Sequence, residues 1–320
     1  MGKPDASDAA ASQTRAARFA HLSSRAAGSA AQASRAATGA ILRPRTYPAI
    51  AREAGVAALN LSLMPVGVVR DVLKVENAFR LGERHSNGHP LRYLQPEAAA
   101  TPIILLHGYF HNRSAFVVMR RSLRRSGFRT VDTVNYNAFT HPIERLAEDL
   151  AEHVDEVLGT VEAHQVHLVG HSLGGIVARY YVQMLGGDEK VHSCVTLGTP
   201  HQGTYAAYIG RGSAPRQVRP NTQLIRMLND GAQPTRTRFV SFYSNLDGMI
   251  LPASNAKLTA PALNAENVLV KDLGHQSLLV SRAVTRGIVD RLTSLEVPDN
   301  TGREASQSVI EPTELDIPGA

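Results

Sequence analysis

The stretch that most constrains the fold is residues 166–181, "VHLVGHSLGGIVARYY", where a run of apolar residues ends at a serine among glycines. The apolar run predicts a buried strand, and the residues after it predict a helix. Gly170 and Gly174, two residues before and two after Ser172, allow a tight turn from strand to helix without steric collision. A G-x-S-x-G motif alone is weak evidence, but its place between strand and helix predicts that Ser172 is held in a strained, exposed turn as a nucleophile.

From about residue 90, short apolar runs alternate with longer amphipathic ones, which is typical of an α/β domain. Continuous rather than alternating apolar strands favour a parallel sheet covered by helices on both faces, so the predicted fold class is doubly wound α/β. The predicted strands are 91–94, 103–108, 128–136, 166–170, 192–198, 238–244 and 267–273. The predicted helices are 114–127, 142–164, 174–186 and 280–295, with one short helix in "PNTQLIRMLNDG" (220–231).

Composition divides the chain into four segments. Residues 1–45 are rich in Ala, Ser and Arg and predict a disordered arm, and residues 46–89 predict a helical extension. The apolar run 54–69 within that extension is interpreted as a helix packed on the domain, with a membrane-surface helix as the alternative. The α/β domain is predicted over 90–296, and residues 297–320 as a disordered tail.

The charge is unevenly distributed. The net charge is +6, but the first 50 residues hold seven basic and two acidic residues, which leaves the remaining chain almost neutral. Electrostatic capture of nucleic acid by the α/β domain is therefore not expected. The single cysteine, Cys194, excludes a disulfide within the chain, and no apolar signal segment is recognised, so we expect a cytoplasmic or peripherally membrane-associated protein.

A serine nucleophile needs a histidine base and an acid that orients it, in the chain order serine, acid, histidine for this fold. His275 follows the last predicted strand, and no histidine lies beyond it. Asp247 follows the strand 238–244 and is the preferred acid. Asp272, three residues before His275 and expected within its strand, and Asp132, which precedes the serine, are the alternatives.

Two backbone amides are needed to hold a developing oxyanion. The amide of Leu173, directly after the serine, is the first, and that of Tyr109 in "HGYFHN" is the second, with Phe110 as its alternative. His107 and His171 lie inside their turns and are predicted to shape them rather than to transfer protons.

Five segments in order, "ILLHGYFHN", "VGHSLGGIVARYY", "LGTPHQGT", "FYSNLDGMILP" and "LGHQSLL", resemble the bacterial lipase/esterase branch of the α/β-hydrolases. The chain is similar both to small lidless bacillar lipases and to class 2 lipases of actinobacteria, from about residue 98 to 293. The resemblance implies a catalytic domain over 90–296, a triad of Ser172, Asp247 and His275, and an oxyanion hole of the Tyr109 and Leu173 amides. It also implies a structural role for His201.

The implied activity is hydrolysis of carboxylic esters through an acyl-enzyme on Ser172. A thioesterase, an acyltransferase, or a deacylase of phospholipids or lipid anchors would use the same triad, and a non-catalytic binding protein of this fold is the alternative from another class. We expect a small-molecule or lipid ester as substrate, no nucleic acid, and at most weak association with a membrane surface. No cofactor and no metal ion are expected.

Overall fold

The computed structural model describes residues 51–60, 62, 64, 90–161, 163–294 and 313–315. The predicted disordered arm, residues 1–45, lies outside this part of the chain. Most of the predicted tail, residues 297–320, lies outside it too.

Seven parallel strands form one sheet in the order β2-β1-β3-β4-β5-β6-β7. This arrangement confirms the predicted parallel α/β class, with the strand order reversing at β1, so that the chain winds outward from there in both directions. The strands are β1 (Ile103–Leu106), β2 (Val131–Val134), β3 (Val166–His171), β4 (Val191–Leu197), β5 (Arg238–Ser244), β6 (Glu266–Val270) and β7 (Thr313–Leu315).

Helices cover both faces of the sheet. The longer ones are α5 (Val117–Arg125), α6 (Ile143–Val161), α7 (Leu173–Met184), α9 (Gln223–Asp230) and α10 (Arg282–Thr293). The shorter helices are α3 (Pro90–Leu94), α4 (Pro96–Ala100) and α8 (Ser213–Gln217), together with the 3₁₀ turns η3 (Arg113–Phe116), η4 (Gly187–Glu189), η5 (Tyr205–Tyr208), η6 (Ala253–Ala256), η7 (Pro261–Leu263) and η8 (Ser277–Leu279).

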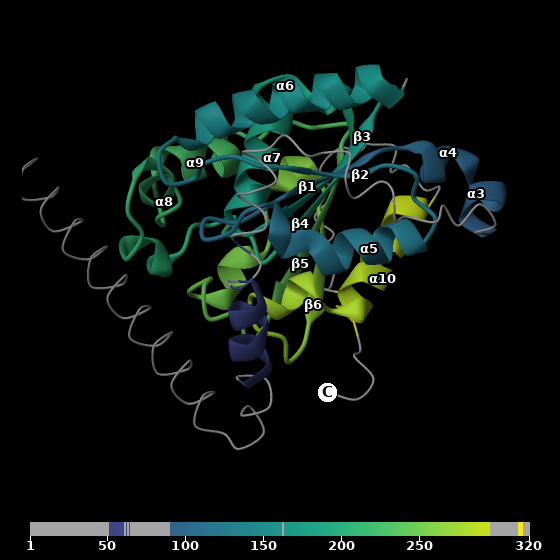
Figure 1. Ribbon diagram of the computed structural model, residues 1–320. Coiled ribbons are helices and arrows are strands. Elements are labelled where there is room, and N and C mark those ends of the chain that lie inside the picture. Colours follow the sequence, from purple (N-terminus) through teal and green to yellow (C-terminus); the bar gives the residue numbers. More distant parts are fainter. Residues whose placement is uncertain are drawn as a thin grey trace, which may run out of the picture. The chain divides into compact units, whose positions relative to one another are not determined.

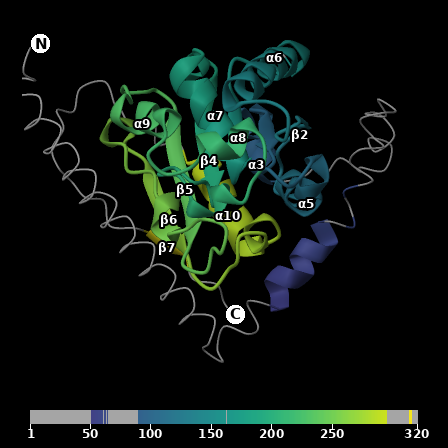
Figure 2. The same ribbon diagram turned by 90° about the vertical axis from the view of Figure 1, so that its left-hand side faces the viewer.

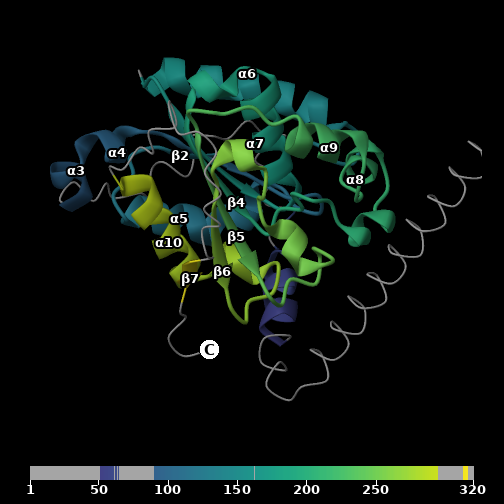
Figure 3. The same ribbon diagram turned by 180° about the vertical axis from the view of Figure 1, so that it is seen from behind.

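The core lies in two layers because successive strand residues point to opposite faces. In β1, Ile104 and Leu106 belong to the cluster that packs on α6, α7 and α9, whereas Ile103 and Leu105 belong to the cluster that packs on α5 and α10. Figures 1 and 3 show these two groups of helices on opposite sides of the sheet. Every residue of β1 and β3 is buried, which explains the continuous apolar run "IILL" of β1.

Local sequence explains where several helices begin. The Ser281 hydroxyl accepts a hydrogen bond from the amide of Val284 at the start of α10, and the Thr222 hydroxyl accepts one from Ile225 at the start of α9. Gly231 follows the last residue of α9, as predicted from "PNTQLIRMLNDG".

Two assignments made from the sequence within the α/β domain are wrong. Residues 91–94, predicted as a strand, lie in the helix α3, because the run "LRYL" is too short for periodicity to distinguish the two and Leu94 is exposed rather than buried in a sheet. Asp272, expected within the last strand before His275, lies beyond β6, which ends at Val270. It adopts a left-handed turn conformation with φ 59°.

The predicted disordered tail contains one ordered element. Residues 313–315 form β7, which pairs with β6 along Val268–Val270. Pairing with a strand about 45 residues earlier supplies backbone hydrogen-bond partners that local composition does not reveal. The expectation of disorder is therefore wrong for this segment.

The N-terminal extension contains a helix over residues 51–60, drawn in purple in Figures 1 and 2 on the α5 and α10 side of the sheet. Val56 and Asn60 are buried on it and Glu53 is half-buried, at a spacing that places all three on one side of a helix. None of the described helices is both long enough and apolar enough to cross a membrane.

Candidate active site

Ser172 lies in a sharp turn between β3 and α7, with φ 55° and ψ −122°. A side chain in this region of backbone space is strained, so surrounding contacts must hold it there. A Cβ added to Gly170 would lie 2.6 Å from the backbone of Gly175, and one added to Gly174 would lie 2.4 Å from the carbonyl oxygen of Leu106. The two glycines that the sequence singled out therefore permit the strand, the helix and β1 to approach this closely.

Asp247 and His275 form a buried pair at the ends of neighbouring strands β5 and β6. Asp247 Oδ2 lies 2.8 Å from Nδ1 of His275, and both residues are almost completely buried. The other carboxylate oxygen, Oδ1, accepts hydrogen bonds from the amides of Met249 (2.9 Å) and Ile250 (3.0 Å). Each oxygen of Asp247 thus has a defined partner, and the carboxylate is held in a single orientation toward the imidazole.

The pair changes the acidity of the histidine. Burial lowers the pKa of His275, but the charge and hydrogen bond of Asp247, together with the charge of Glu53, outweigh it and raise the pKa above its ordinary value. A proton on Nδ1 faces Asp247, which leaves Nε2 free to accept a proton. This is the tautomer that a general base requires.

The serine turn and the histidine loop lie against one another. His171, next to Ser172, has its ring centroid 4.5 Å from that of His275, and its Nε2 lies 3.1 Å from the carbonyl oxygen of His275. Because a carbonyl only accepts, Nε2 of His171 donates this bond. On another side, a Cβ added to Gly108 would lie 2.9 Å from Cβ of Ser172.

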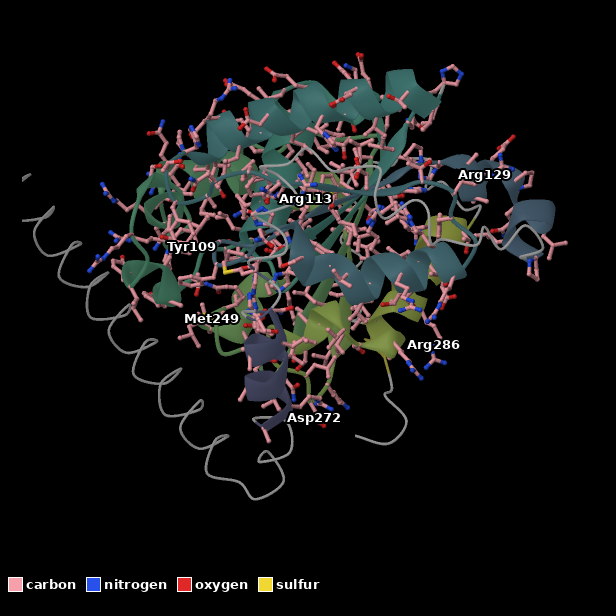
Figure 4. All side chains as sticks on the ribbon, viewed as in Figure 1. Tyr109, Arg113, Arg129, Met249, Asp272 and Arg286 are labelled. Atoms are coloured by element: carbon pink, nitrogen blue, oxygen red, sulfur yellow. The ribbon has the colours of Figure 1, made fainter. Side chains whose placement is uncertain are left out.

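The two predicted oxyanion residues come from two different segments near the serine turn. Leu173 is the first residue of α7, and Tyr109 follows Gly108, the glycine that packs against Ser172. Figure 4 shows Tyr109 and Met249 toward one end of the sheet and Arg129, which precedes β2, toward the other. Phe110, the alternative to Tyr109, is 52% exposed.

The alternative acids lie elsewhere. The carboxylate of Asp132 lies 3.1 Å from Nε2 of His153, on α6. Asp272 is exposed, and its amide donates a hydrogen bond to the side chain of Asn245. Of the three aspartates considered from the sequence, the structure brings Asp247 to His275.

The other histidines near the site are buried and neutral. Burial lowers the pKa of His107 to about 4, and its ring stacks on Tyr136 with centroids 4.3 Å apart. Burial lowers the pKa of His201 and of His171 well below the ordinary range. His201 Nε2 lies 2.9 Å from the hydroxyl of Thr196, within the sheet. These contacts agree with the predicted shaping roles.

Sequence reasoning missed the contribution of the N-terminal extension. The Glu53 carboxylate accepts hydrogen bonds from the backbone of the loop that contains His275, and Asn60 bonds to Gln276. The pattern "IAREAGVAALNL" indicates a helix, but nothing in its spacing indicates what Glu53 contacts, because more than 200 residues separate the partners.

No group of three or more His, Cys, Asp or Glu side chains suited to a metal ion occurs within the described ranges.

Comparison with known families places residues 101–275 in the alpha/beta hydrolase fold. The chain belongs to this family. The matched range begins before β1 and ends at His275, so it contains the serine turn and the Asp247–His275 pair.

Individual relatives are more distant. A triacylglycerol lipase of Vibrio cholerae is 32% identical over 119 residues, which is 36% of this chain and 37% of that protein. A triacylglycerol lipase of Pseudarthrobacter phenanthrenivorans is 33% identical over 115 residues, or 33% and 35% of the two chains. The chain thus spans about a third of the length of these curated relatives. The mature lipase BlEst2 of Bacillus licheniformis shares the fold with a TM-score of 0.54 at 18% identity, covering 61% of this chain and 93% of that one.

Proposed function

We propose that the protein is a serine hydrolase of carboxylic esters, with Ser172 as nucleophile, His275 as general base and acid, and Asp247 as the acid that orients His275. The observation that supports this most is the strained Ser172 turn beside the buried Asp247–His275 hydrogen bond of 2.8 Å. Backbone strain at a serine is costly and typical of functional sites, and a histidine oriented by a carboxylate can serve as the base that such a serine needs.

The reaction has two acyl-transfer steps. His275 Nε2 takes the proton of the Ser172 hydroxyl as its oxygen attacks the ester carbonyl, and the amides of Tyr109 and Leu173 hydrogen-bond to the oxyanion. The tetrahedral intermediate collapses to an acyl-enzyme as the alcohol leaves with the proton from His275. Water then attacks the acyl group, gives its proton to His275 and releases the acid, and that proton returns to Ser172. Asp247 stabilises the imidazolium in both steps.

Exposed aromatic side chains beside Tyr109 favour an apolar acyl or alcohol group in the substrate. The rings of Phe110 and Phe139 lie 4.7 and 4.5 Å from that of Tyr109, and each is about half exposed. The Tyr109 hydroxyl donates a hydrogen bond to the carbonyl oxygen of Arg211. Tyr109 thus contacts the segment after η5, the turn that contains the exposed Tyr208. Together with the similarity to triacylglycerol lipases, this supports acyl esters as the substrate class.

The test is a panel of p-nitrophenyl esters of increasing acyl length, with acyl thioesters and acceptor alcohols as further arms, run on wild type and Ser172→Ala. We expect ester turnover in the wild type and a loss of about 10³-fold or more in Ser172→Ala with the fold retained. Faster turnover of thioesters than of matched esters would assign a thioesterase. Acyl transfer to the alcohols in preference to water would assign an acyltransferase. Near wild-type activity in pure Ser172→Ala would contradict the proposal.

A further inference from the structure

The loop that contains His275 is held by a segment outside the matched family range. Glu53, on the helix over residues 51–60, accepts hydrogen bonds at its Oε2 from the amide of Ser277 (2.9 Å) and from the hydroxyl of Ser277 (2.8 Å). Its Oε1 accepts one from the amide of Gln276. One carboxylate therefore satisfies three donors in the two residues that directly follow His275.

The backbone on the other side of His275 is shaped to admit the same carboxylate. A Cβ added to Gly274 would lie 2.3 Å from Oε2 of Glu53 and 2.4 Å from its carboxyl carbon. Any side chain at position 274 would therefore displace Glu53. The carboxylate lies against the residues on both sides of His275 in the chain.

Further contacts fasten the same helix to the same loop. Arg52 donates to the carbonyl oxygen of Asp272, and the Asn60 side chain donates to Oε1 of Gln276 at 3.1 Å. A few residues on, the carbonyl oxygen of Met64 accepts from the Asn112 side chain (2.8 Å), in the loop that follows β1. Arg52, Glu53 and Asn60 thus contact the histidine loop, and Met64 contacts the loop that contains Tyr109.

We propose that Glu53 is a positioning residue for catalysis, whose carboxylate holds the 274–277 loop and supplies His275 with a second negative charge besides that of Asp247. This inference rests on the proposed serine-hydrolase chemistry. Glu53 touches neither substrate nor reacting atoms; it acts through the position and the protonation of His275.

The negative charge that Glu53 supplies can be measured through the protonation of His275. Asp247 and Glu53 both raise the pKa of His275, against the effect of burial. The neighbouring rings of His171 and His111 are neutral where His275 titrates, since burial lowers the pKa of His111 to about 4 and that of His171 further.

The experiment measures the protonation midpoint of His275 by histidine NMR, assigned with His275→Gln, and the pH profile of kcat in the full chain. The variants are Glu53→Gln, Glu53→Asp, Asn60→Ala and the distant charge control Glu97→Gln, which alters an exposed residue of α4. In Glu53→Gln we expect the midpoint and the acidic limb of kcat to move to lower pH, because the imidazolium loses a stabilising charge. We also expect kcat to fall about tenfold, because the NH2 group of glutamine cannot accept a hydrogen bond and the loop loses the bonds made to one of the two carboxylate oxygens.

The controls separate charge from packing. Glu53→Asp keeps the charge with a shorter reach, so it should restore the midpoint while kcat stays reduced. Asn60→Ala removes a helix-to-loop bond without a charge, and it and Glu97→Gln should leave the midpoint in place. If Glu53→Gln is insoluble, Gly274→Ala displaces the same carboxylate and should lower the midpoint in its place.

An unmoved midpoint in Glu53→Gln, or an equal shift in Asn60→Ala, would overturn the inference, whatever happens to kcat. Because the NMR midpoint is read without turnover, this result is independent of the proposed reaction. Ester hydrolysis by the wild type that persists in Ser172→Ala would instead overturn the proposed function.

Discussion

The serine turn and the histidine loop are positioned in different ways. Ser172 is held by residues within a few positions of it and by close backbone packing, such as that of Gly174 on Leu106. His275 is held by side chains from distant segments, with Asp247 28 residues away and the Glu53–Ser277 bond spanning 224. Backbone contacts in a buried sheet leave little freedom, whereas a loop held by side-chain hydrogen bonds depends on each of them. The position of Ser172, the proposed nucleophile, thus depends on a local motif, whereas that of His275, the proposed base, depends on the whole fold.

The largest effect expected from breaking this arrangement is on the histidine side. Asp247→Asn should lower kcat by about 10⁴-fold, because an amide neither stabilises the imidazolium nor enforces the tautomer with Nε2 free. Asp272→Asn is the matched control from the same loop region, where the side chain is exposed, and it should change kcat little. Steady-state kinetics on both variants decides this, and the reverse ranking would move the acid to Asp272.

On the serine side, the expected effect is on folding. Gly174→Ala places a methyl group 2.4 Å from the carbonyl oxygen of Leu106 and 2.7 Å from that of His107, both backbone atoms that cannot move aside cheaply. We expect the free energy of unfolding to fall by about 3 kcal/mol or more, measured by urea denaturation. An undisturbed stability would mean that α7 and β1 do not pack as closely as described.

The other end of the serine's strand gives a pH-dependent effect. Burial lowers the pKa of His167 in β3 to about 3, so the folded state binds fewer protons than the unfolded state between that pH and about 6.5. Neutral, buried His167 therefore does not lower the free energy of unfolding above pH 6.5. As the pH falls below 6.5, the unfolded state gains a proton that the folded state does not bind, and the free energy of unfolding drops by about 3 kcal/mol at pH 4. Denaturation at several pH values should show a shallower acid dependence in His167→Leu than in wild type. An equal dependence would contradict the buried neutral state.

The smallest effect concerns the helix that holds the histidine loop. A Cβ at Gly55 would meet nothing within 4 Å, so Gly55→Ala should add about 0.5–1 kcal/mol to the stability of residues 51–60 without disturbing Glu53. Hydrogen exchange of the helix amides measures this directly. Faster exchange in the variant would show that the helix is not formed as described.

The sequence predicts the features of the fold and of the candidate site that depend on local backbone geometry. Gly170 and Gly174 predict the serine turn because steric exclusion acts within a few residues. The apolar runs predict the parallel sheet because strands buried on both faces have no polar side. The pairing of Asp247 with His275 could be expected only from strand ends meeting at one edge of a sheet.

Other features depend on partners that the local sequence does not contain. "LRYL" fits a strand or a helix equally well, and only its tertiary surroundings decide for α3. β7 gains its hydrogen bonds from β6, and Glu53 reaches a loop more than 200 residues away. Between β4 and β5 the sequence predicts one helix, within residues 220–231, but η5 and α8 occur there besides α9, because turns this short leave no clear periodicity.

The most direct measurement on the central claim is to trap the covalent intermediate. A p-nitrophenyl ester mixed rapidly with the wild-type protein should release a burst of p-nitrophenol equal to the protein concentration, if deacylation is the slower step. Acid quenching and peptide mass spectrometry should then find the acyl group on the peptide that contains Ser172. A fluorophosphonate should label the same residue, and Ser172→Ala should show neither adduct. An acyl group or a fluorophosphonate adduct on another residue, or its persistence in Ser172→Ala, would contradict the account.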